Sequence, residues 1–288
     1  MFVLAACSQN ADVGDQLHVV ATTSVLGDVV SEIVGSDAVV EVLIPTGQDP
    51  HGFQVSAAQA ASLREADLVI AAGLGLEEGL SDALENAESD GVMVLELAPR
   101  LEPIAFSSDP EVLDPHFWLD PVRMGEAVAV IGSALDQLDS SIDWGARAGR
   151  FRAEIDSAMA QSLDTLAAVP MDRRILITNH DALGYFAQRY NFDVVGTIVG
   201  GGSTQSDASP ADIAELVGVI EELGIAAMFI DATASHELAD AVAGELDFPF
   251  AVVELFESNL GDPGTGAETY LGMVVTNAER VAEALVSP

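Results

Sequence analysis

The chain has no lysine, only one cysteine and no long apolar segment. All ten of its basic side chains are Arg, against 47 Asp and Glu, so the net charge at pH 7 is −37. A surface this negative argues against nucleic acid and anionic membrane surfaces as partners, and it concentrates cations near the protein. The single cysteine, Cys7, excludes a disulfide within the chain. Without about 20 consecutive apolar residues, we expect no membrane-spanning helix.

The segment around Cys7 suggests a lipid anchor. Leu4-Ala5-Ala6-Cys7 resembles a bacterial lipobox, in which the Cys becomes the lipid-modified first residue of the mature protein. Six residues before Cys7 are too few for a complete signal peptide, so either the natural start lies upstream or the match is accidental. We expect residues 1–16 to be a lipoprotein signal remnant and tether, with the lipid on Cys7 as the only membrane contact.

The rest of the chain alternates strand and helix signals, which is typical of an α/β fold with parallel sheets. With 288 residues and 49% hydrophobic residues, it is long enough for two domains. Strand signals stop for almost 50 residues after Pro121, where two helices are expected, and they then resume. We predict two lobes with parallel-type sheets flanked by helices, joined by one long rigid connecting helix. The predicted domains are an N-terminal lobe at 17–143, the connecting helix at 144–169 and a C-terminal lobe at 170–288.

Three of the five histidines, His51, His116 and His180, occupy the same kind of position, where a strand ends or a helix begins. In open α/β sheets, ligands bind at these ends of the strands. The spacings of 65 and 64 residues match no local metal motif, so the fold itself must bring the three together. A single such His would be read as a loop or capping residue, but three at equivalent positions favour a shared metal site. His18 and His236 fit no motif, and we expect both to be structural.

The sequences around these histidines resemble signature stretches of one family. Asp49–Gln54, Asp114–Pro121 and Thr178–Phe186 are similar to motifs of the zinc- and manganese-binding receptors of ABC importers, the ZnuA/TroA type. The resemblance extends from about residue 17 to residue 285. It implies two α/β lobes joined by one long rigid helix, a metal held between them, and three ligands carried over one by one to His51, His116 and His180. It also implies an ABC permease and its ATPase as partners.

The fourth ligand has two candidates in the sequence. The family usually has an acid near the C-terminus, just before a Ser-Leu or Thr-Leu pair. If the motif is aligned on Leu260, the residue at the ligand position is Ser258. If it is aligned instead on an acid followed directly by Ser, the alignment shifts by one residue and the ligand position is Glu257. We expect Glu257 to be the ligand, with Asp231, at the end of a predicted strand, as the alternative.

The ligand set indicates which metal to expect. Three neutral imidazoles and one carboxylate favour Zn²⁺, whereas Mn²⁺ prefers more oxygen ligands, so we predict zinc with manganese as the alternative. Four acids, each close in sequence to one of the three histidines, could orient the imidazole rings, although each also fits a helix cap or a turn. These acids are Asp49, Asp114, Asp120 and Asp181.

These observations lead to one main hypothesis and two rivals. We expect a monomeric, extracytoplasmic receptor that captures the metal and delivers it to a permease, with little lobe motion because one long helix resists wide hinge opening. Its affinity should fall on acidification as the histidines protonate. A zinc-dependent hydrolase with a three-His site is the rival from another class, although we find no general base next to a His on one helix. An adhesin-like surface lipoprotein with a structural metal is the third possibility.

Overall fold

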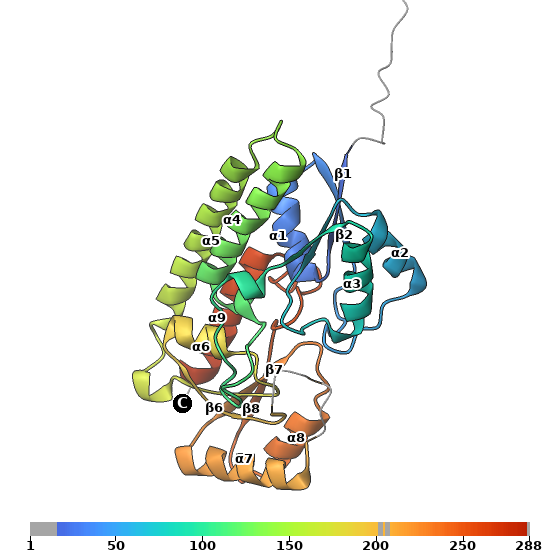
Figure 1. Ribbon diagram of the computed structural model, residues 1–288. Coiled ribbons are helices and arrows are strands. Elements are labelled where there is room, and N and C mark those ends of the chain that lie inside the picture. The colour runs from blue at the N-terminus through green and yellow to red at the C-terminus, as the bar shows by residue number, and fades with distance from the viewer. Residues whose placement is uncertain (1–15, 201–203, 205–207, 287–288) are drawn as a thin grey trace, which may run out of the picture.

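Two four-stranded parallel sheets form the frame of the computed structural model, which describes residues 16–200, 204 and 208–286 (Figure 1). The first sheet has the order β2-β1-β3-β4 and the second the order β6-β5-β7-β8, with every neighbouring pair parallel. The strands are β1 (Leu17–Ala21), β2 (Ala38–Val42), β3 (Leu68–Ala71), β4 (Met93–Glu96), β5 (Ile175–Thr178), β6 (Asp193–Thr197), β7 (Ala227–Asp231) and β8 (Ala251–Leu255). Both sheets therefore have the same arrangement, and the predicted fold class is confirmed.

The helices begin where the sequence carries start signals. Thr23 caps the first helix by accepting a hydrogen bond from Leu26 N, and Ser56 forms a capping box with Gln59. Asp120 caps another helix whose first residue is Pro121. The helices are α1 (Ser24–Val34), α2 (Ala57–Glu65), α3 (Ser81–Ser89), α4 (Pro121–Leu138), α5 (Trp144–Leu166), α6 (Gly184–Tyr190), α7 (Pro210–Leu223), α8 (Glu237–Gly244) and α9 (Tyr270–Val286).

A single hydrophobic core runs through both lobes. Successive strand residues face opposite sides of a sheet, so Val19 and Val20 enter different cores. One face of each sheet joins a common core with α1, α4, α5 and α9, which contains Val19 of the first sheet and Phe229 of the second. The other faces form separate cores, one with α2 and α3 and one with α7 and α8. Because the common core is continuous, a wide rotation of one lobe against the other would expose apolar surface.

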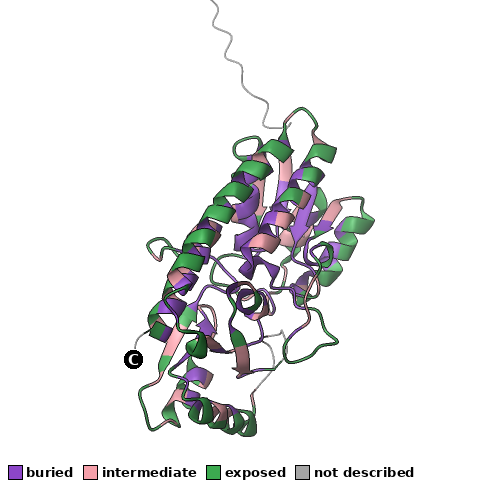
Figure 2. Cartoon of the chain, turned by 90° about the vertical axis from the view of Figure 1, so that its left-hand side faces the viewer, coloured by how far each residue is buried: buried purple, intermediate pink, exposed green. Residues whose placement is uncertain are grey.

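Helix α5 connects the two halves of the chain and packs along both α4 and α9. Its inner face buries Phe151, Ile155 and Leu166, while its outer face is exposed (Figure 2). In the part of the chain that the structure describes, no helix is both long and apolar enough to cross a bilayer. The exact domain boundaries stay a prediction, and the tether with Cys7 lies outside the described residues.

One helix starts later than its apolar pattern indicates. The sequence predicts a helix over 76–86, but α3 begins at Ser81 after a 3₁₀ turn at Glu78–Leu80. Within the predicted span, Glu77 has φ −94° and ψ 61°, which is not helical, and the loop at 72–77 ahead of the turn includes Gly73 and Gly75 at positive φ. This loop wraps around the Glu77 carboxylate, which accepts hydrogen bonds from the backbone N–H groups of Ala72 and Gly73.

Candidate metal centre

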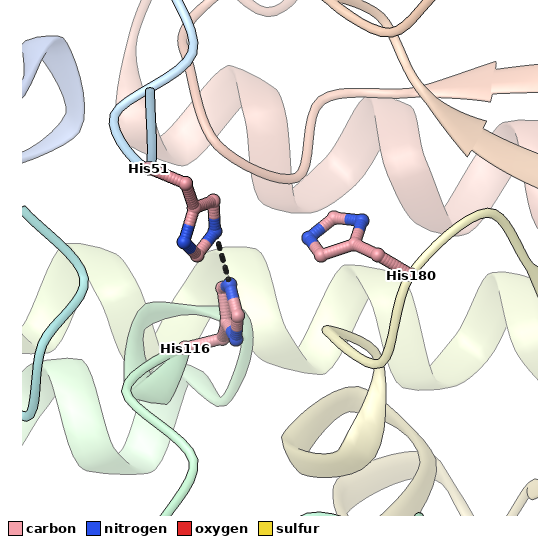
Figure 3. Close-up of side chains that lie close together, drawn as sticks. All are labelled: His51, His116 and His180. Atoms are coloured by element: carbon pink, nitrogen blue, oxygen red, sulfur yellow. Dashed lines mark hydrogen bonds between the residues drawn. The ribbon is translucent and has the colours of Figure 1, made fainter. Parts of the chain in front are cut away.

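The three predicted histidines lie side by side between the lobes (Figure 3). His51 is in the loop between β2 and α2, and His116 immediately precedes a 3₁₀ turn, Phe117–Leu119, that leads into α4. His180 follows β5. All three are buried, with exposed fractions of 4%, 0% and 0%. Segments more than 60 residues apart therefore deliver their imidazoles to one place.

The spacing of the rings suits one metal ion. The ring centroids are 5.3 Å apart for His51 and His116, 5.7 Å for His51 and His180, and 5.4 Å for His116 and His180. Among the described residues, one nitrogen from each ring lies within 4.8 Å of the other two. The Nε2 atoms of His51 and His116 are 3.3 Å apart. Two nitrogens bound tetrahedrally to one zinc at 2.0–2.1 Å are separated by about 3.3 Å as well.

Asp114 fixes the orientation of the His116 ring. Its Oδ1 accepts hydrogen bonds from the His116 backbone N–H and from Nδ1, both at 2.8 Å, and neither side chain is exposed to solvent. Burial raises the pKa of the Asp114 carboxyl well above its usual range. With the Nδ1 proton donated to Asp114, the lone pair of the ring is on Nε2, which faces the other two imidazoles.

The three imidazoles are held in the neutral form that binds metals. Burial, together with the neighbouring imidazoles of His116 and His180, lowers the pKa of His51 to about 3. Burial also lowers the pKa of His116 to about 4 and that of His180 to about 3. At neutral pH none of the three carries a proton that would have to leave before a cation binds.

His180 and Glu257 present buried polar atoms without partners. Neither ring nitrogen of His180 makes a hydrogen bond to a described residue, nor does Oε2 of Glu257, although Nδ1 and Oε2 are 3.5 Å apart. Burial raises the pKa of Glu257 well above its usual range, and the charge of Asp231 adds to this. Unpaired buried polar atoms cost stability, and a bound cation would remove that cost.

The other predicted acids have different partners. Both oxygens of Asp231 already accept backbone hydrogen bonds at 2.7 Å, one from Thr233 and one from Ser258. Asp49 accepts from the backbone N–H of His51, while Asp120 caps α4 and Asp181 binds Ser107 and Ser108. Of the four acids proposed to orient imidazoles, Asp114 alone bonds to a ring among the described contacts. The group of ligand atoms within 4.8 Å of one another contains no carboxylate, so Glu257 would have to move inward to reach a metal.

Sequence reasoning missed several residues that hold the centre. Trp118 donates through Nε1 to the backbone oxygen of Glu257 at 2.7 Å, and Tyr185 donates to the backbone oxygen of Asp114 at 3.2 Å. Their partners lie 139 and 71 residues away, so no local pattern marks these contacts. His18 and His236 lie outside the cluster, and each pairs with a glutamate on a strand.

Two parallel α/β lobes with three buried imidazoles between them define the architecture of a two-lobed metal-binding protein. A family model described as ZnuA, zinc-uptake complex component A, periplasmic, matches residues 19–284. The chain belongs to the ZnuA family, and it is therefore a metal-binding receptor of an ABC importer.

Relatives of this chain are named for two different metals. The zinc-binding protein TroA of Treponema pallidum is 30% identical, over 99% of this chain and 94% of its own length. The manganese-binding lipoprotein MntA of Halalkalibacterium halodurans is 28% identical, over 94% of this chain and 89% of its own length. The solved structure of the periplasmic zinc-binding protein TroA of Treponema pallidum has a TM-score of 0.88 and 28% identity, covering 94% of this chain and 100% of that chain.

Proposed function

We propose that this protein captures Zn²⁺ outside the cytoplasm and delivers it to an ABC permease and its ATPase. The observation that carries the proposal is the convergence of three buried, neutral imidazoles, those of His51, His116 and His180, on one point. A solute-binding family has no need of a catalytic residue, and we propose none. The receptor acts as a monomer and reaches the membrane through a lipid on Cys7.

Zinc is the proposed ion because the converging atoms are nitrogens. Zinc accepts four nitrogen, oxygen or sulfur ligands in a tetrahedron, whereas manganese favours oxygen-rich sets. Relatives named for zinc and for manganese support either metal equally, so the argument for zinc rests on this chain's own side chains. Mn²⁺ remains the alternative.

Glu257 is the proposed fourth ligand. Its Oε2 makes no hydrogen bond to a described residue and lies 3.5 Å from Nδ1 of His180, and burial raises the pKa of the carboxyl. Asp231, the alternative, would have to give up backbone hydrogen bonds from Thr233 and Ser258. Glu257 would therefore lose fewer hydrogen bonds than Asp231 on binding a cation.

Elemental analysis of the purified protein tests the proposal directly. We expect about one zinc per chain, with loss of the metal in His116→Ala and retention in His236→Ala, which removes a His outside the cluster. Competition between Zn²⁺ and Mn²⁺ then tests the choice of metal, and equal affinities would refute it. A protein that takes up neither ion would refute the receptor function. Zinc affinity that is unchanged in Glu257→Gln would exclude Glu257 as a ligand.

A further inference from the structure

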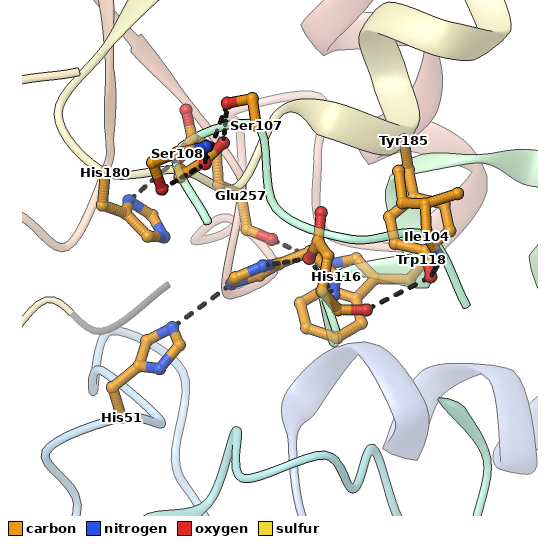
Figure 4. A network of polar contacts seen from close by, with 11 residues as sticks. His51, Ile104, Ser107, Ser108, His116, Trp118, His180, Tyr185 and Glu257 are labelled. Atoms are coloured by element: carbon orange, nitrogen blue, oxygen red, sulfur yellow. Dashed lines mark hydrogen bonds and ion pairs between the residues drawn. The ribbon is translucent and has the colours of Figure 1, made fainter. Parts of the chain in front are cut away.

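Three sets of polar contacts link the segment that carries His116 to the segment that carries His180. Asp181 accepts hydrogen bonds from Ser107 Oγ and Ser108 N, each at 2.8 Å (Figure 4). Tyr185 bridges the same two segments through its hydroxyl, which accepts from the Ile104 backbone N–H and donates to the Asp114 backbone oxygen, both at 3.2 Å.

The third contact between these segments is an ion pair. Arg189 on α6 binds both oxygens of Asp120, at 2.6 and 2.8 Å, and Asp120 is almost fully buried at the start of α4. A bidentate pair of this kind fixes both position and orientation. With the continuous core beneath them, these contacts make His116 and His180 a fixed pair.

His51 is held differently, on the loop 45–55, which we call the His51 arm. Among the residues that the structure describes, polar contacts of Asn259 and Thr204 join the arm to the C-terminal lobe. Asn259 Nδ2 donates to the backbone oxygen of Gln48 at 2.7 Å, and the Thr204 hydroxyl donates to Asp49. Asn259 is itself buried, and its Oδ1 accepts from Ser24 Oγ at 3.2 Å. Residues 46–48 of the arm are exposed to solvent.

The His51 arm has open space on both sides. A cavity of about 390 Å³ on one side is lined by Asp49 together with His180 and Asp231. Another, of about 420 Å³, is lined by His51 and Gly52 of the arm and by residues at the start of α3. The imidazole of His51 lines the second cavity and can therefore leave the centre without displacing the core. His180 lines the first cavity, but the contacts of Asp181, Tyr185 and Arg189 hold its segment to that of His116.

We propose that metal enters and leaves by movement of the His51 arm against the fixed pair of His116 and His180, and that Asn259 is the positioning residue that holds the arm closed. The inference rests on the proposed function. It differs from a rotation of the lobes, which would have to break the Asp120–Arg189 pair and open the shared core.

The test is the rate at which zinc-loaded full-length protein releases Zn²⁺ to an excess of a chromogenic chelator. Asn259→Leu keeps the size of the side chain but removes the bond to Gln48, so release should be about tenfold faster, as expected for one buried hydrogen bond. Ser162→Ala is the control, since it removes buried hydrogen bonds to Ala158 and Val274, away from the arm and the three histidines, and its release rate should stay within about twofold of wild type. Wild-type release from Asn259→Leu, or equal acceleration in both variants, would overturn the proposal.

Amide hydrogen exchange on the wild-type protein gives a second measurement that needs no variant. Removing Zn²⁺ should speed exchange most in residues 46–55 and least in residues 104–120 and 180–189. Equal changes in all three segments, or the largest change in 180–189, would overturn the movement of the arm. A wild-type protein that binds no Zn²⁺ would overturn the proposed function itself, and with it this inference.

Discussion

Replacing Asp114 with Asn isolates the contribution of one carboxylate to metal binding. The two Asp114–His116 hydrogen bonds, each 2.8 Å long, can both survive the substitution because the oxygen of the new amide still accepts. What disappears is the carboxylate, which makes the imidazole more basic when it ionises. Changes of this kind behind a metal-binding His typically cost about 10–100-fold in affinity, or about 1.4–2.7 kcal/mol.

The same substitution should also lower stability. Oδ2 of Asp114 makes no hydrogen bond to a described residue. It packs closely against Gly184, since a Cβ atom added to that glycine would lie 3.0 Å from Oδ2. An amide NH₂ in place of Oδ2 would be a buried donor without an acceptor, at a cost of about 1–3 kcal/mol. We therefore expect a lower urea midpoint together with the weaker zinc binding.

Competition with a chelator of known affinity at pH 7 measures the first effect, and urea unfolding the second. Asp109→Asn is the matched control, because it makes the same substitution at an exposed position in the same segment. Zinc affinity that is unchanged in Asp114→Asn would refute the role of the carboxylate. An equal loss in Asp109→Asn would show that general charge, and not the contact with His116, is responsible.

Three other predictions follow from the geometry. Burial lowers the pKa of His51 and His180 to about 3 and that of His116 to about 4, so the three histidines stay neutral as pH falls below 6.5. Zinc affinity should therefore drop steeply only near pH 4. A competition titration that shows a roughly tenfold loss of affinity per pH unit from about pH 6.5 downward would contradict this. With free Zn²⁺ at about 100 times Kd, binding stabilises the folded protein by about 2.7 kcal/mol. Removing the zinc with a chelator should therefore lower the melting temperature by about 5–10 °C, which calorimetry with and without chelator measures. Arg189→Met should destabilise the protein by about 2–3 kcal/mol in urea unfolding, because Asp120 is left charged and buried, and adding Asp120→Asn should restore part of the loss.

The fold could be predicted because its signals are local. Two-residue periodicity, capping residues and prolines are read within a few positions, and they gave the strand and helix pattern on both sides of α5. The assembly of His51, His116 and His180 was anticipated from equivalent positions and from family motifs, and the described structure brings all three together.

The roles of the neighbouring acids could not be predicted in the same way. Asp49, Asp114 and Asp181 have almost the same local context, next to a His at a strand exit or helix entry. Asp114 bonds to the imidazole two residues on, whereas Asp181 turns to Ser107, 74 residues away. Which of these happens depends on the segment packed opposite, and a sequence pattern does not specify it.

Charge and selectivity are separate properties of this protein. A net charge of −37 attracts any cation, but salt screens it beyond about 8 Å at physiological ionic strength, and it does not distinguish Mg²⁺ or Ca²⁺ from Zn²⁺. The buried centre has the opposite character, since it offers neutral nitrogens that hard, oxygen-preferring cations bind poorly. The abundant cations can therefore accumulate around the protein without occupying the site. On the proposed function, selection for a transition metal follows from burying His51, His116 and His180 in their neutral form, and the acidic surface contributes only to the rate of encounter.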